Sequence, residues 1–138
     1  MALTKLPTLT LTAKASGAVT ANRLVAYSGA RCGTQAMKVL GVAVYDAADG
    51  TDYPVDVDGT SIVEAGAAIA VGDSLVTDNQ GRAIPASALA IAAGATGVTS
   101  AAANGASALT GGNLPQFVFG DALTVAADAG AFIEFKFR

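Results

Sequence analysis

Acidic side chains are concentrated in one short stretch of the sequence, between residues 46 and 58. With the following Gly59, the stretch reads DAADGTDYPVDVDG and contains Asp46, Asp49, Asp52, Asp56 and Asp58. Clustered carboxylates are oxygen ligands of the kind that Ca²⁺ prefers, so a calcium loop is one interpretation. The spacing differs from that of an EF-hand, because no glutamate follows at the required distance. Aspartate is also typical of turns, since its carboxylate accepts hydrogen bonds from nearby backbone amides. We favour turns at Asp49-Gly50 and Asp58-Gly59 over metal binding.

Other residue types that carry out catalysis are scarce. The sequence has no histidine and a single cysteine, which excludes Ser-His-Asp and Cys-His catalysis and histidine-bound metals. Arg31 could lower the pKa of the neighbouring Cys32 thiol, but no second cysteine or histidine completes a redox pair or dyad. We expect Cys32 to be buried or incidental. With no tryptophan and three tyrosines, a glycoside hydrolase would lack sugar platforms. We therefore expect no enzyme, no catalytic residue and no cofactor.

Charge is sparse along the chain. Of its 138 residues, 52% are hydrophobic and only 14% charged, and the net charge is −3. The eight basic residues lie far apart, so they form no concentrated positive face for nucleic acid. Residues 1–16 contain no signal-peptide core, and the most apolar stretch, residues 86–95, is too short for a membrane helix. We expect a cytosolically made, soluble protein that binds neither nucleic acid nor membrane. Few charges on so much alanine and glycine surface indicate a surface partly covered by a partner.

Short segments with a two-residue period, separated by turn residues, dominate the sequence. Strands are predicted at residues 3–15, 24–27, 36–45, 53–57, 60–64, 74–76 and 131–138. The last of these has the clearest alternation, with Ile133, Phe135 and Phe137 on one face. Asp58-Gly59 is expected to form a hairpin turn between residues 53–57 and 60–64. Residues 88–113 are rich in alanine and glycine and are expected to form a low-complexity loop or insertion. The pattern predicts a single all-β domain over residues 1–138, a sandwich or barrel.

Three stretches form an ordered pattern of small and turn residues. They are LGVAVYDAADGTDYPVDVDG at residues 40–59, EAGAAIAVGDSLVTDNQGRAIPA at residues 64–86, and residues 120–138, with a weaker match at residues 19–25. Their order and spacing resemble the capsid cement (decoration) proteins of tailed bacteriophages. The resemblance implies an antiparallel, jelly-roll-like β-sandwich on the outer surface of the virion capsid. It also implies a structural protein that clamps neighbouring capsomers against internal DNA pressure.

The partners implied by the resemblance are the major capsid protein and further copies of the chain, with a homodimer favoured and a trimer left open. Synthesis is expected in the host bacterial cytoplasm. Residues 3–15 and the terminal strand are hypothesised to be edges that pair with neighbours. The interface residues proposed on this basis are Leu6, Leu9, Leu11, Phe132, Phe135 and Phe137. That both strands lie inside the chain's own sheets stays open, and is favoured for Phe135 and Phe137.

Two other classes of function compete with this interpretation. A carbohydrate- or host-binding β-sandwich module of a phage virion would be expected to show surface aromatics or a calcium cluster. Of these features, the sequence offers few aromatics and only the aspartates of residues 46–58. A cupin-like hydrolase or lyase would bind its metal through histidines, which the sequence lacks.

Overall fold

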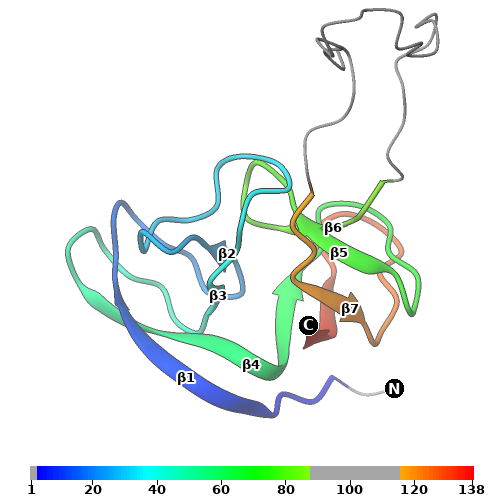
Figure 1. Cartoon of the computed structure of the whole chain (residues 1–138), viewed down its shortest axis with the longest axis horizontal. Helices are drawn as coiled ribbons and strands as arrows, with labels where there is room; N and C mark the ends of the chain where they lie inside the picture. The colour runs from blue at the N-terminus through cyan, green and yellow to red at the C-terminus, as the bar shows by residue number, and fades with distance from the viewer. Residues whose placement is uncertain (1–2, 88–115) are drawn as a thin grey trace, which may run out of the picture.

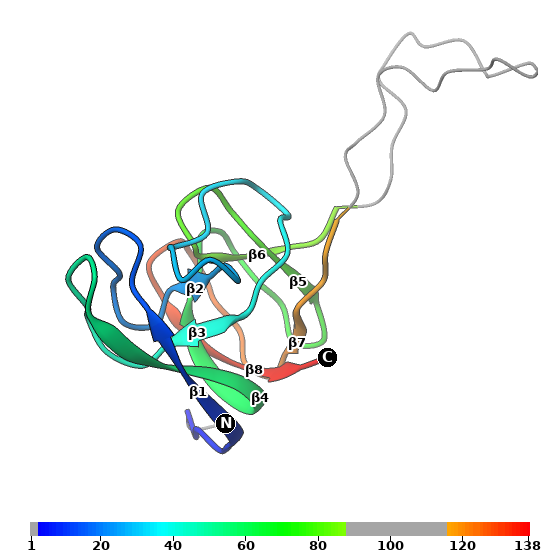
Figure 2. The same cartoon turned by 60° about the vertical axis from the view of Figure 1, so that its left-hand side comes forward.

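The computed structural model of the chain describes residues 3–87 and 116–138. Within these two ranges the chain forms strands and no helix. The strands are β1 (Pro7–Lys14), β2 (Leu24–Val25), β3 (Gly41–Ala43), β4 (Asp52–Glu64), β5 (Ser74–Thr77), β6 (Ala83–Pro85), β7 (Gly120–Ala122) and β8 (Phe132–Phe137). All strand pairs are antiparallel, in the order β2-β3-β4-β8-β7-β5-β6, with β1 also paired to β4 (Figures 1 and 2). The predicted all-β antiparallel fold is confirmed, whereas the jelly-roll connectivity stays a prediction.

The sheet curls into a nearly closed, barrel-like sandwich. A parallel bridge between Ala65, which follows β4, and Ala83 of β6 brings the far end of the strand order back to β4. The Gly66 amide strengthens this closure by donating to the Ala83 carbonyl at 2.8 Å. A curled sheet of this kind shields its inner face while needing few large side chains, which suits an alanine-rich sequence.

The predicted hairpin at Asp58-Gly59 is wrong. A single strand of 13 residues, β4, runs through this position. Its first part pairs with β1 and β3, and its second part pairs with β8. Gly59, with a φ of 88°, lets the strand bend between the two pairings, and a side chain there would meet the backbone of Leu6 and Thr8. The glycine signal was real, but it marks a bend in one long strand.

Most of the other predicted strands are present with shorter bounds. The predictions at residues 3–15, 24–27, 36–45, 74–76 and 131–138 contain β1, β2, β3, β5 and β8. Two short strands, β6 and β7, were not predicted. The expected loop at residues 88–113 lies outside the described residues.

The two halves of the fold repeat the same strand register. Leu11 of β1 pairs with Val55 of β4, and in the same arrangement Ser61 of β4 pairs with Phe135 of β8. The pairing of β3 with β4 likewise repeats in the pairing of β7 with β8. Residues 7–26 correspond to residues 57–76, residues 40–47 to residues 119–126, and residues 50–57 to residues 130–137. The fold is an internal structural duplication in which β4 belongs to both halves.

Backbone hydrogen bonds outside the strands support this correspondence. Val19 and Ala47 exchange two backbone hydrogen bonds, and so do their counterparts Ile69 and Ala126. The Asn22 amide donates to Ala43, as the Gly72 amide donates to Ala122. Both Asn22 and Gly72 have positive φ angles, so the turn itself is repeated.

The apolar core follows the duplication, but the halves are covered differently. The first-half cluster of Ala15, Val19, Val25, Ala43, Tyr53 and Val55 has its counterpart in Ala65, Ile69, Leu75, Ala122, Ile133 and Phe135. The second-half cluster also takes in Leu24 and Val42 from the far face of β2 and β3. Their counterparts, Ser74 and Asp121, instead hydrogen-bond to each other at 3.1 Å. The first half therefore covers the core of the second, while the equivalent face of the second half is polar.

Candidate interaction surfaces

The aspartates of residues 46–58 fasten loops and strands together. Asp46 accepts a hydrogen bond from the Ala21 amide at 2.7 Å, and Asp49 accepts one from the Gly17 amide at 2.8 Å. Each aspartate thus caps a loop that faces it across the fold. Among the described residues, no three acidic or cysteine side chains are grouped so that they could hold a metal ion. Of the two favoured turns, Asp49-Gly50 is present and Asp58-Gly59 is not; the carboxylates of Asp46 and Asp49 cap the amides of loops far away in sequence, and not those of their own turns.

Asp56 anchors β1 to the sheet. Its carboxylate is buried and lies 2.7 Å from the Lys5 ammonium. It also accepts hydrogen bonds from the hydroxyls of Thr10 and Ser61, each at 3.0 Å. One position further along the face, Asp58 accepts a hydrogen bond from Thr8 at 3.0 Å. A buried carboxylate with three partners holds the strand in a fixed position on β4.

Cys32 is buried in the core, as expected. Burial raises the pKa of the Cys32 thiol to about 11, and a side-chain hydrogen bond with Thr77 opposes this effect. The thiol therefore stays protonated at neutral pH and is not a nucleophile. Burial also raises the pKa of Tyr53, whose hydroxyl donates to the Gly29 carbonyl at 2.8 Å. The most shifted side chains are core groups with internal partners.

β1 is exposed on both of its faces. Every residue of the strand is exposed except Ala13, which is half-buried. The proposed interface residues Leu6, Leu9 and Leu11 are 70%, 50% and 42% exposed. β1 lies on the rim of the molecule in Figure 1, with β4 along one edge. No strand occupies its other edge in the part of the chain that the structure describes.

The outer edge of β1 carries backbone groups that point away from β4. Thr12 faces Pro54 of β4, which has no amide hydrogen to donate. The Pro54 carbonyl points towards β3, where it accepts a hydrogen bond from the Val44 amide. The Thr12 amide is therefore directed outward. In the second half, the amides of Thr60 and Glu64 bond to backbone carbonyls of other segments. The corresponding edge of β1 has no such partner among the described residues.

The three aromatic residues predicted for the terminal strand separate into two groups. Phe132 is 47% exposed at the start of β8. Phe135 and Phe137 are buried, and their rings pack edge to face with centroids 4.7 Å apart. β8 lies between β4 and β7, so one of its faces is in the core. Of the three, only Phe132 is available on the surface of this chain.

A second apolar surface was not predicted from the sequence. Six residues line a hollow of about 460 Å³: Leu3, Val71, Leu123, Thr124, Val125 and Phe132. We call this surface the valine hollow. Val71 and Val125 are each 67% exposed although both are large and apolar. Thr4 fixes Leu3 beside the hollow, because its amide and hydroxyl both donate to the buried Glu134 carboxylate.

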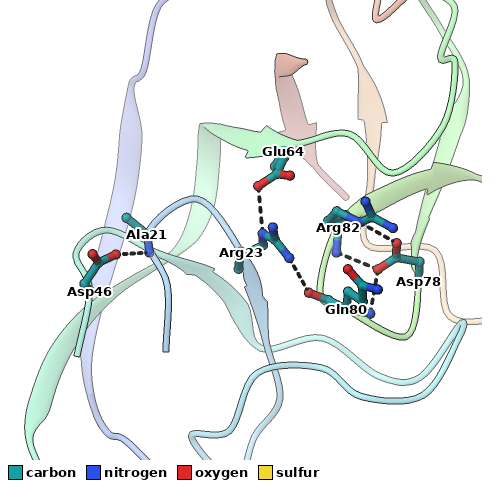
Figure 3. Close-up of polar contacts among 7 residues, drawn as sticks. All are labelled: Ala21, Arg23, Asp46, Glu64, Asp78, Gln80 and Arg82. Atoms are coloured by element: carbon teal, nitrogen blue, oxygen red, sulfur yellow. Dashed lines mark hydrogen bonds and ion pairs between the residues drawn. The ribbon is translucent and has the colours of Figure 1, made fainter. Parts of the chain in front are cut away.

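A polar junction joins the two halves of the fold (Figure 3). Arg23 reaches from the first half to the Glu64 carboxylate at 2.8 Å and to the Gln80 carbonyl at 2.9 Å. Asp78 accepts hydrogen bonds from the amides of Gln80 and Arg82 and pairs with the Arg82 guanidinium at 2.8 Å. All of these contacts are internal, so they fix the geometry of the fold and leave no free charge pair for a substrate.

The described residues thus form an all-β fold with exposed apolar surfaces. No helix that could cross a membrane is found among them. The family model for phage cement proteins matches residues 4–137. The chain belongs to the phage cement protein family, as the resemblance predicted. Its role is structural and capsid-associated.

Among solved structures, the N base of the head fiber gp8.5 of bacteriophage phi29 is similar to this chain. The two share 25% sequence identity with a TM-score of 0.63, over 94% of this chain and 93% of that one. A search of curated proteins found no match.

Proposed function

We propose that the chain binds the outer surface of a tailed-phage capsid and clamps neighbouring capsomers, which stabilises the shell against the pressure of packaged DNA. The observation that carries the proposal is β1, an ordered strand that is exposed on both faces and open along one edge. Membership of the phage cement protein family supports a capsid partner, and we propose that this partner is the major capsid protein.

The geometry of β1 supports docking by strand addition. An exposed edge presents unpaired amide and carbonyl groups, and an extended segment of another protein can pair with them. Leu9 and Leu11 lie beside this edge and can cover apolar side chains of the added segment. Asp56 holds β1 in place before docking, so little conformational entropy is lost when the partner binds.

Clamping follows from repetition over the shell. A copy that contacts two capsomers adds interface area across their boundary, and this area must be lost before the capsomers separate. The second contact forms at a high effective concentration once the first is made, so modest contacts give strong attachment. The same multiplicity raises the temperature at which the shell ruptures.

The test is reconstitution with capsids that have been stripped of this protein. The purified chain is mixed with these capsids, binding is followed by co-sedimentation, and rupture is followed by heating. Stoichiometric binding with a higher rupture temperature is expected. If the chain does not bind capsids but binds glycans or host cells, the proposal is wrong and the chain is a host-binding module.

A pair of variants tests the strand-addition step. Thr12→Pro removes the outward amide and fills its place with the proline ring, while the pairing with β4 does not use that amide. Thr12→Val keeps the amide and replaces the hydroxyl with a methyl group of similar size. We expect both variants to fold, Thr12→Pro to lose capsid binding and Thr12→Val to retain it. Normal binding by a folded Thr12→Pro variant would exclude this edge as the docking site.

A further inference from the structure

A second hollow lies where the two halves of the fold meet. Its floor contains Leu40 and Val57 of the first half, together with their counterparts Phe119 and Phe137 of the second half. Equivalent segments of the two halves therefore face each other across this surface, and ligand sites are often found at such internal interfaces. We call this surface, which encloses about 270 Å³, the seam hollow.

Aromatic and cationic side chains surround the floor of the seam hollow. Tyr27 is 66% exposed and Phe117 is 49% exposed. The Nζ atom of Lys38 lies over the Tyr27 ring, 5.7 Å from its centroid, and Arg138 completes the rim. Tyr27 and Lys38 also line a neighbouring hollow of about 410 Å³, so the two hollows share a wall and form one continuous surface.

Backbone hydrogen bonds hold the walls of this surface in place. The Phe117 amide donates to the Ala36 carbonyl at 3.1 Å, which ties the segment before β7 to the loop between β2 and β3 (Figure 1). The Arg138 amide donates to the Phe119 carbonyl, also at 3.1 Å. The surface is therefore formed before any ligand binds, so its own ordering costs a ligand little conformational entropy.

The charges of the seam hollow are positive, although the chain carries a net charge of −3. Among the described residues that line the two hollows there is no aspartate or glutamate. Arg138 already pairs with Asp121 at 3.2 Å. Lys38 is exposed and has no acidic partner within the described part of the chain. Lys38 is therefore available to pair with an anionic group of a ligand.

We propose that the seam hollow binds an acidic peptide segment of a partner protein, with a large apolar side chain of that segment on the floor and an aspartate or glutamate beside Lys38. The apolar side chain would be covered by Leu40 and Val57, and the exposed rings of Tyr27 and Phe117 would pack along its sides. β1 contributes no residue to either hollow, so this site is separate from the docking edge and goes beyond the proposed function.

Other classes of ligand fit the lining less well. The hydroxyls of a saccharide need several acceptors, and the described lining residues include no carboxylate or side-chain amide to supply them. A nucleic acid strand needs a series of cations along its phosphates, whereas the described lining residues supply only Lys38 and Arg138. An acidic peptide with an apolar side chain needs one free cation beside an apolar floor, which matches the seam hollow.

The test titrates the full chain with short synthetic peptides and follows its backbone amide resonances by two-dimensional NMR. The probe is the capped peptide Glu-Glu-Phe-Glu-Leu-Glu-Glu. One control peptide has lysine in place of every glutamate, and the other has serine in place of phenylalanine and leucine. We expect the probe to shift the resonances of Tyr27, Lys38 and Phe117, and each control to bind there about 10-fold or more weakly, because it lacks one of the two contacts.

A charge-reversal variant tests the role of Lys38. Lys38→Glu should weaken binding of the glutamate peptide about 10-fold or more and should strengthen binding of the lysine peptide at the same residues. The matched control is Arg31→Glu, which makes the same change of charge at an exposed position of the same loop that lines neither hollow. The control should bind the glutamate peptide like the unaltered chain. Thermal unfolding checks that both variants fold.

Three results would overturn the proposal. The first is an absence of shifts at Tyr27, Lys38 and Phe117 with the glutamate peptide. The second is equal binding of the serine-substituted peptide, and the third is an equal loss of affinity in Lys38→Glu and Arg31→Glu. Either of the last two would show a general attraction between charges and no site at the seam hollow.

Discussion

The Nε atom of Arg23 lies 2.8 Å from a carboxylate oxygen of Glu64, and this contact fastens the first half of the fold to the start of the second. Both side chains are largely shielded from water. The counterpart of Arg23 is Asp73, which instead caps the Ala70 amide within its own turn. The duplication thus changes character where the two halves meet, and the Arg23 contact is specific to the junction.

Arg23→Ala is expected to lower the free energy of unfolding by about 1–2 kcal/mol, because it leaves Glu64 and the Gln80 carbonyl without their partner. Chemical denaturation measures the change. The matched control is Arg138→Ala, which breaks the exposed pair with Asp121 and should cost about 0.5 kcal/mol or less. Equal losses in the two variants would show that the junction contributes no more than a surface pair.

Local patterns in the sequence were sufficient to predict the all-β fold and its first and last strands, β1 and β8. Alternation in Phe132–Phe137 correctly placed Ile133 and Phe135 on the core face, because a two-residue period can be read within one segment. The pattern failed for Glu134, which is buried because Thr4, far away in sequence, supplies its hydrogen bonds. Contacts of this kind leave no local trace.

The duplication was not visible in the sequence because register, and not residue identity, is what the halves share. The structural counterparts of Leu24 and Val25 are Ser74 and Leu75. The dipeptide Leu-Val occurs again at residues 75–76, one position away from these counterparts, so matching the two sequences by identity gives the wrong register. The strands β6 and β7 are too short to show alternation, and they pair with segments remote in sequence. A faint signal existed in the repeated Ala-Ala-Asp at residues 47–49 and 126–128.

The surface could be predicted only in part. Leu6, Leu9 and Leu11 were chosen from the edge position of their strand, and they are exposed. The sequence predicted an edge strand at residues 3–15, and among the described residues β1 has a neighbouring strand on one side only, with both of its faces exposed. The valine hollow collects residues from four separate segments, so no local pattern could have located it.

Gly41 and Gly120 are expected to be equally intolerant of a side chain. At each glycine, a methyl group would meet the carbonyl oxygen of the facing strand, at Asp56 and at Lys136. Either substitution by alanine should lower the free energy of unfolding by about 2–3 kcal/mol. Gly33→Ala is the control, because the space there is open and its stability should be unchanged or slightly higher. Tolerance at one of the two glycines but not the other would argue against their equivalence.

Asp56→Ala is expected to release β1 from the sheet. The substitution removes the acceptor of Thr10 and Ser61 and leaves the Lys5 ammonium unpaired, at a cost of about 3 kcal/mol. Hydrogen exchange should therefore accelerate at the amides of β1 more than at those of β8. Asp58→Ala removes a single exposed contact with Thr8 and serves as the control. Uniform acceleration in all strands would indicate global destabilisation and would contradict a local anchoring role.

Stability is expected to fall at alkaline pH because of Cys32. The folded protein keeps the thiol proton up to a pKa of about 11, whereas the unfolded thiol ionises near its ordinary value of 9.0. The stabilisation by the protonated thiol is therefore complete below pH 9.0 and is lost as the pH rises towards 11. Burial also raises the pKa of Tyr53, which acts in the same direction.

Denaturation midpoints measured across this pH range should decline less steeply in Cys32→Ala than in the unaltered chain. Adding Tyr53→Phe to the Cys32→Ala variant should reduce the remaining decline further. A thiol-specific reagent applied at neutral pH should label Cys32 only as fast as the protein unfolds, and at once in denaturant. Rapid labelling of the folded protein, or identical pH slopes in the Cys32→Ala variant and the unaltered chain, would contradict a buried, protonated thiol.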